Sequence, residues 1–186
     1  GAQAEFCVCA AGSLARKPKI LSHTRAAIVP ISALTAWQAL YERVQLRAGQ
    51  TVLIHGAAGA VGIFAVQIAR LLGGHVTGTA SAGNLEFVRS LGAHRAIDFS
   101  SEPVEAEVQN FDVIFDMVGG ETLRRSWPLL SPTGRLVTVA TPSASSVDQR
   151  TRDAFLLVRP DGAQLEQIAA LIDSGKLNVY LAESFP

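Results

Sequence analysis

The amino-acid sequence predicts an α/β fold, a doubly wound parallel sheet with helices on both of its faces. Two observations predict it. The β-branched run 51–55 opens through a glycine-rich loop, 56–62, into a segment with helical periodicity, 63–72. Segments of strand and helix character then alternate along the rest of the chain. We therefore expect six strands in the order 3-2-1-4-5-6.

The first predicted helix covers residues 28–44, with Ser32 as its N-cap. Its inward stripe consists of Ala33, Trp37, Leu40 and Val44. Gly49 ends it before the first strand, 51–55, which is apolar on both faces as buried parallel strands are.

A strand at 75–79 completes a strand–helix–strand unit with the first strand and the helix 63–72. The further predicted elements are helix 84–91, strand 96–99, a weak helix 104–109, strand 111–116, helix 121–130, strand 135–140, strand 154–158 and helix 164–174. Gly175 caps the last helix. Residues 5–9 alternate like a strand, which we interpret as the tail of a missing unit.

Composition excludes several classes of protein. The 186 residues are 48% hydrophobic and 17% charged, with a formal net charge of zero, so nothing favours nucleic acid or an anionic membrane as partner. No 18-residue apolar span or secretory signal occurs, which predicts a cytoplasmic protein without membrane association. Cys7 and Cys9 are expected to be reduced and half-buried, and the histidines lack ligand spacing, so no metal is predicted.

The loop 56–62 carries the clearest functional signal. Gly59 would let the backbone approach a pyrophosphate, and Gly62 would let the helix lie close to the strand. Free amides at the helix start would attract the anion. The spacing differs from G-x-G-x-x-G, because Ala57 stands at the first glycine position and Gly56 lies one residue earlier. The alternative is a glycine-tolerant turn with no ligand.

Several longer segments resemble the medium-chain dehydrogenase/reductase superfamily, and within it the zinc-independent quinone oxidoreductase group. They are residues 34–40, 48–62, 91–93, 111–120 and 134–137. The resemblance implies a Rossmann domain over residues 28–176, with remnants of a second, largely absent catalytic domain at both ends. Residues 1–27 would be the remnant of the N-terminal catalytic domain and its connector, and residues 177–186 the start of the return segment.

The resemblance also assigns expected roles. The pyrophosphate cradle would comprise Gly56, Ala57, Gly59, Ala60, Val61 and Gly62. Thr35 would be a nicotinamide-side contact, and Phe155 with Leu156 would approach the carboxamide, unless they only form a buried edge strand. Val118, Gly119 and Ala140 lie at predicted strand ends, where such sheets bind ligands, with ordinary turn chemistry as the alternative. No residue is assigned as catalytic.

His55, immediately before the loop, has three readings: a catalytic base, an orienting residue or a packed side chain. The second strand suggests which cofactor is used. Residues 79–83 contain no acid to bind a ribose 2′-hydroxyl, which predicts NADP(H), with Ser81 and Asn84 as partners of the 2′-phosphate.

Two positions depart from the family pattern at this subsite. Asn84 stands where relatives often have lysine, and Phe99 stands where an aromatic residue with a hydroxyl is common. Arg89 or Arg95 would supply the positive charge that the lysine of relatives provides at this subsite. The alternative is that both arginines are solvated surface residues.

The expected function is the cofactor-binding portion of an oxidoreductase that uses NADPH to transfer hydride to a small-molecule substrate, a quinone, enone or related carbonyl compound. The alternative is a non-catalytic nucleotide-binding or redox-sensing module. The apolar run 154–158, expected at the sheet edge, predicts a homodimer in which this strand pairs with its mate.

Overall fold

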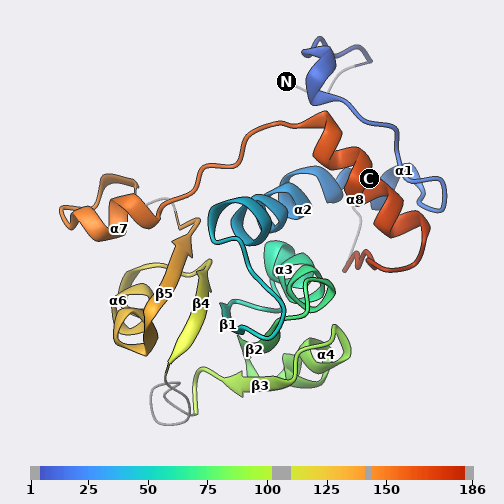
Figure 1. The fold of residues 1–186 in the computed structure, drawn as a ribbon. Helices are drawn as coiled ribbons and strands as arrows, with labels where there is room; N and C mark the ends of the chain where they lie inside the picture. Colours follow the sequence, from blue (N-terminus) through green and yellow to red (C-terminus); the bar gives the residue numbers. More distant parts are fainter. Residues whose placement is uncertain (1–4, 102–109, 141–143, 183–186) are drawn as a thin grey trace.

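A computed structural model describes residues 5–101, 110–140 and 144–182. Its centre is a five-stranded, all-parallel sheet with the order β3-β2-β1-β4-β5 (Figure 1). The strands are β1 (Thr51–His55), β2 (His75–Ala80), β3 (Arg95–Asp98), β4 (Phe111–Asp116) and β5 (Leu130–Thr138). The predicted α/β class, the parallel sheet and the order of its first five strands are confirmed.

Helices lie on both faces of the sheet. Those in the described residues are α1 (His23–Ala27), α2 (Val29–Trp37), α3 (Ala60–Leu71), α4 (Leu85–Ser90), α6 (Gly120–Ser126), α7 (Gln149–Ala154) and α8 (Gly162–Asp173). Short 3₁₀ turns are η1 (Ala11–Ser13), η3 (Ala82–Asn84) and η4 (Trp127–Leu129). In Figure 1, α2, α3 and α8 lie together on one side, and α6 lies beside β4 and β5 on the other.

Each face of the sheet has its own apolar core. Val52 and Ile54 of β1 belong to the larger core, which includes residues of α2, α3 and α8. Leu53 and Ile114 point to the smaller core, with Leu123 of α6. Both faces of β1 and β4 are therefore buried, which explains why these strands read as continuous apolar runs.

The N-terminal helical region differs from its prediction. The chain turns into α1 at Ser22, whose hydroxyl accepts from the Arg25 N–H, and α2 begins at Val29, so Ser32 lies inside a helix and caps nothing. After α2 the backbone forms a π-helix, η2 (Gln38–Arg43). The Val44 N–H accordingly donates to Ala39 O, five residues back, at 3.0 Å.

The predicted sixth strand, 154–158, is wrong. Ala154 ends α7, and Phe155 makes one isolated parallel bridge to Thr138. The Leu156 N–H donates to Thr138 O at 2.9 Å, after which the chain leaves the sheet and runs to α8. An apolar run indicates burial, but a strand also needs a neighbour along its length, and here the contact with β5 ends after one residue pair.

The N-terminal segment and its cysteines also differ from their predictions. Residues 5–9 form no strand, and Cys7 and Cys9 are free and exposed rather than half-buried. The weak helix expected at 104–109 lies outside the described residues. Within the described ranges, no helix has both the length and the apolar character that crossing a membrane requires.

Candidate cofactor site

The carboxyl ends of β1 and β4 mark the point where the sheet reverses its order of addition. From β1 the chain adds β2 and then β3 on one side, and it returns to add β4 and β5 on the other. Open α/β sheets bind ligands in the crevice at this switch point. The loops after β1, β2, β4 and β5 therefore border this crevice.

The glycine loop after β1 is tied to the end of β2. Gly56, with φ of 74°, donates its N–H to Thr79 Oγ1 at 3.3 Å, and the Ala57 N–H donates to Thr79 O at 2.9 Å. The buried methyl group of Ala57 lies against Gly78. A Cβ added to Gly78 would lie 2.8 Å from that methyl carbon. The loop is thus fixed by Thr79 and leads directly into α3.

Gly59 and Gly62 have different surroundings. A Cβ on Gly62 would clash with the Gly56 carbonyl oxygen and lie 2.7 Å from Ala57 C, so α3 can approach the loop only because this side chain is absent. A Cβ on Gly59 would meet only Gly56 O, at 3.2 Å. Gly59 is exposed, and so is Ala60, the first residue of α3.

The start of α3 presents features that suit a bound pyrophosphate. The first-turn amides of a helix, here those of Ala60, Val61 and Gly62, have no acceptor within the helix. No acidic residue occupies the first turn of this 12-residue helix. The exposed glycine in front of it leaves the backbone approachable, so these residues fit a dinucleotide phosphate by charge and by space.

His55 links three elements beneath the loop. Its buried ring lies with Nδ1 3.2 Å from Thr79 Oγ1 and Nε2 2.9 Å from Ser126 Oγ. The Ser126 hydroxyl donates to Thr122 O at 2.7 Å, so it accepts from His55 through an Nε2–H. The sequence left three interpretations open, and this burial and bonding fit an orienting or a packed histidine better than a catalytic base.

Asp116 organises the loop after β4, and sequence reasoning missed it. Its fully buried carboxylate accepts from the N–H groups of Val118 and Gly119, each at 3.1 Å, and from Thr138 Oγ1 at 2.7 Å. Thr138 in turn accepts from the Ala140 N–H at 3.2 Å. The predicted residues Val118, Gly119 and Ala140 are therefore brought together at the strand ends. An acid that ends an apolar strand before two glycines was the available signal.

The residues expected around a 2′-phosphate also gather at one edge. Asn84 Nδ2 donates to Ser81 Oγ at 3.0 Å just after β2. The Phe99 N–H donates to Ala80 O at 3.2 Å, and the residue is 64% exposed. Ser81, Asn84 and Phe99 thus share the carboxyl edge next to the glycine loop.

The charges near this subsite differ from those expected. Arg95 begins β3 beside Thr77, at the amino end, and Arg89 pairs with Glu86 on α4. Asp98 ends β3 beside the subsite, and its pKa is lowered because its carboxylate accepts from the backbone N–H and the hydroxyl of Ser100. The structure thus brings an ionised acid to this edge and neither of the two arginines.

Thr35 and Phe155 lie on other elements. Thr35 is buried within α2 and donates its hydroxyl to Ile31 O at 2.7 Å. Phe155 adjoins Thr138 at the end of β5. The Thr35 hydrogen bond stays within the helix, so a contact of Thr35 with a cofactor remains a prediction.

Comparison with known proteins identifies the family. The family described as zinc-binding dehydrogenase matches residues 91–186. NAD(P)H oxidoreductase RTN4IP1, mitochondrial, of Danio rerio is 33% identical over 218 residues, covering 100% of this chain and 56% of that protein. The chain belongs to the medium-chain dehydrogenase/reductase superfamily.

Other members of this superfamily extend the comparison. The structure of the quinone oxidoreductase from Coxiella burnetii has a TM-score of 0.84 and 32% identity, covering 90% of this chain and 54% of that one. A 2-methylene-furan-3-one reductase from Solanum lycopersicum is 33% identical over 189 residues, covering 100% of this chain and 46% of that protein. The chain spans about half the length of the curated relatives that it matches.

Two points concern this superfamily member in particular. In the part of the chain that the structure describes, no group of three or more His, Cys, Asp or Glu residues could hold a metal ion. The cytoplasmic expectation is overturned, because the relatives from Danio rerio, Mus musculus and Arthroderma benhamiae are named mitochondrial proteins. The lack of a targeting signal within these 186 residues was no guide to compartment.

Proposed function

We propose that this chain is the cofactor-binding part of an NADPH-dependent oxidoreductase that reduces a quinone, enone or related carbonyl compound. The observation that carries the proposal is the glycine loop at the switch point, fixed by Thr79 and followed by a helix start without acidic residues. The names of the relatives support the reaction class, since they include NAD(P)H oxidoreductases, a furanone reductase and a quinone oxidoreductase homolog.

In this proposal the residues of the chain bind and orient. The α3 amides and Gly59 hold the pyrophosphate, and Ser81 with Asn84 receives the 2′-phosphate. Asp116 keeps Val118 and Gly119 in place at the end of β4, where the nicotinamide half would lie. The cofactor itself supplies the hydride. The absence of an acid in residues 79–83 supports NADPH, whereas the ionised Asp98 nearby opposes a 2′-phosphate.

Calorimetric titration of the chain with NADPH tests this function. We expect saturable binding of one NADPH per chain, competed by adenosine 2′,5′-bisphosphate. A folded chain that binds neither NADPH nor NADH would contradict the proposal. NADPH oxidation in the presence of a quinone or an enone then tests the reaction, and we expect negligible turnover by this chain alone because it spans about half of its relatives.

We also propose a homodimer that associates through residues 154–158. The support is that Leu157, in the segment that touches β5 through one bridge, is 78% exposed, so that an apolar side chain is open to a second copy.

A further inference from the structure

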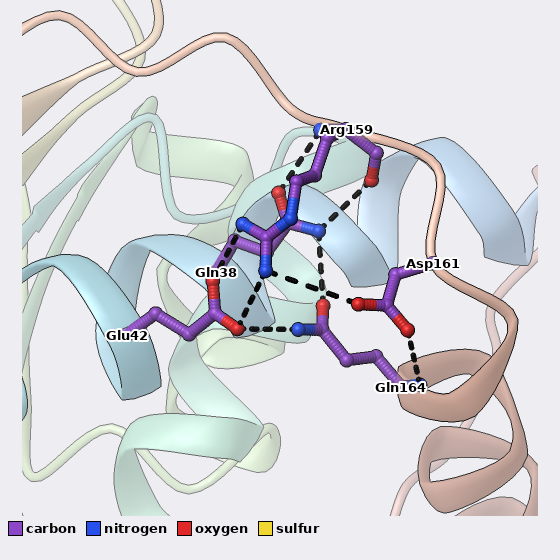
Figure 2. A network of polar contacts seen from close by, with 5 residues as sticks. All are labelled: Gln38, Glu42, Arg159, Asp161 and Gln164. Atoms are coloured by element: carbon purple, nitrogen blue, oxygen red, sulfur yellow. Dashed lines mark hydrogen bonds and ion pairs between the residues drawn. The ribbon is translucent and has the colours of Figure 1, made fainter.

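A cluster of five polar residues joins three segments beyond the sheet edge. We call it the polar clamp; it consists of Gln38, Glu42, Arg159, Asp161 and Gln164 (Figure 2). The first two lie on the π-helix η2, Arg159 and Asp161 lie on the segment that leaves β5, and Gln164 lies in the first turn of α8. None of them was singled out by the sequence.

Gln38 holds the backbone of Arg159 on both sides. Its Oε1 accepts from the Arg159 N–H at 3.0 Å, and its Nε2 donates to Arg159 O at 2.9 Å. The same Nε2 donates to Gln164 Oε1 at 2.9 Å. Gln38 is 1% exposed, so its removal would leave buried polar groups without partners. Gln38 thus pairs with this peptide as a neighbouring strand would.

Glu42 holds the side chain of the same residue. The Arg159 guanidinium donates to both carboxylate oxygens of Glu42, at 2.8 and 3.0 Å, in the two-point geometry that is strongest for such pairs. Gln164 Nε2 also donates to Glu42 Oε1. Asp161 lies 3.8 Å from the guanidinium and accepts from the Gln164 N–H at 3.0 Å. Backbone and side chain of Arg159 are therefore both fixed.

The clamp fixes one end of a short segment whose other end lies at the candidate site. Three residues before Arg159, the Leu156 N–H donates to Thr138 O, the last residue of β5. Phe155 forms its bridge to the same residue. The segment 155–161 is thus held at β5 by one residue pair and at η2 and α8 by the clamp.

The position of this segment relates it to one half of a dinucleotide. The residues expected at the adenosine ribose, Ser81 and Asn84, follow β2. Because the two halves of a dinucleotide lie on opposite sides of the switch point, the nicotinamide half falls over β4 and β5. Phe155 and Leu156, next to the end of β5, border that half.

We propose that Gln38 and Arg159 are positioning residues for the nicotinamide half of the cofactor. They do not touch it; they hold Phe155 and Leu156 against the end of β5, so that this wall of the site is preformed. The proposal rests on the function proposed above. The clamp is not needed to hold α8 itself, because Ile168 and Ile172 bury its apolar face in the larger core.

The test compares a ligand that has a nicotinamide with one that lacks it. Gln38→Leu removes the amide, and Arg159→Ala removes a side chain that is 58% exposed, which keeps the test open if the first variant does not fold. Glu166→Gln, at an exposed position of α8, is the matched control. NADPH and adenosine 2′,5′-bisphosphate are titrated against each chain by calorimetry, and the fluorescence of bound NADPH is recorded.

We expect both clamp variants to bind NADPH about fivefold to tenfold more weakly than the parent chain. This corresponds to a loss of about 1.0–1.4 kcal/mol in binding free energy. The dissociation constant of adenosine 2′,5′-bisphosphate should stay within about twofold, since that half of the site is remote from the clamp. Emission of bound NADPH should move toward that of the free cofactor.

Two results would overturn the inference alone. Equal weakening of both ligands would show a general structural role, and unchanged NADPH affinity and emission would show no role at all. A parent chain that binds neither ligand would instead overturn the proposed function, and this inference with it.

Discussion

Alanine substitutions at two glycines of the loop test its packing and its ligand binding separately: Gly62 for packing and Gly59 for binding. Gly62→Ala places a Cβ against the Gly56 carbonyl oxygen, 2.7 Å from Ala57 C and 2.8 Å from Ala57 Cα. All three atoms are backbone, so strand or helix must move. Gly59→Ala makes the same chemical change three residues earlier, where the nearest atom is Gly56 O at 3.2 Å and φ is −78°.

The expected magnitudes follow from these distances. Overpacking costs about 1–3 kcal/mol, so Gly62→Ala should lower the free energy of unfolding by that amount. For a chain of this size each kcal/mol lowers Tm by about 2–4 °C, which gives a decrease of about 2–12 °C. Gly59→Ala should change Tm by less than about 2 °C, yet weaken NADPH binding, because its Cβ stands where the phosphate approaches.

Thermal unfolding and calorimetric titration of both variants check this pair of predictions. Gly12→Ala, on η1 and outside the candidate site, is the control, since its Cβ would meet no atom within 4 Å. The packing argument fails if Gly62→Ala melts with the parent. The ligand argument fails if Gly59→Ala folds normally and binds NADPH as tightly as the parent does.

Three further predictions concern cofactor choice, pH and association. NADPH should bind more tightly than NADH in calorimetric titrations at one ionic strength, because residues 79–83 contain no acid; tighter NADH binding would reverse the assignment and point to Asp98. The pKa of His94 is lowered in the folded chain, first by desolvation and then by the charges of Arg70 and His75. The contribution of His94 to stability is therefore complete above its ordinary pKa of 6.5 and is lost as the pH falls through the lower pKa of the folded state. Urea unfolding across this range should show that loss, and an equal loss in His94→Gln would exclude His94 as its source. Leu157→Asp should convert a dimer to a monomer in light scattering, and a parent that is already monomeric would remove the dimer from consideration.

Two of the strands that were predicted correctly are buried on both faces. The runs 51–55 and 111–116 are covered on both faces, so their apolar character reports their position directly. The run 154–158 is equally apolar, but its conformation depends on the residues before it. The Asp148 side chain accepts from the Arg150 N–H at 3.2 Å and caps α7, and Ala154 is the last residue of that helix. This capping residue was a readable signal.

The part of the site that depends on local backbone geometry could be predicted from the sequence. The part that depends on contacts between side chains far apart in the sequence could not. Gly56, Gly59 and Gly62 could be read from local spacing. The contact of Asp116 with Thr138 joins residues 22 positions apart, and that of Gln38 with Arg159 joins residues 121 apart. No local pattern reports such pairs, and nothing in the sequence marked residues 38–43 as a π-helix rather than an α-helix.

The π-helix η2 takes up one residue more than α-helical bonding would use at this point. A one-residue deletion within 38–43 can therefore close into an α-helical turn and leave its two flanks in register, whereas the same deletion in α2 would rotate the flanks against each other by about 100°. Val44 and Leu46 are buried on one flank and Thr35 on the other, so neither can follow freely. Among homologous sequences, one-residue differences in length should therefore fall within residues 38–43 and not within α2.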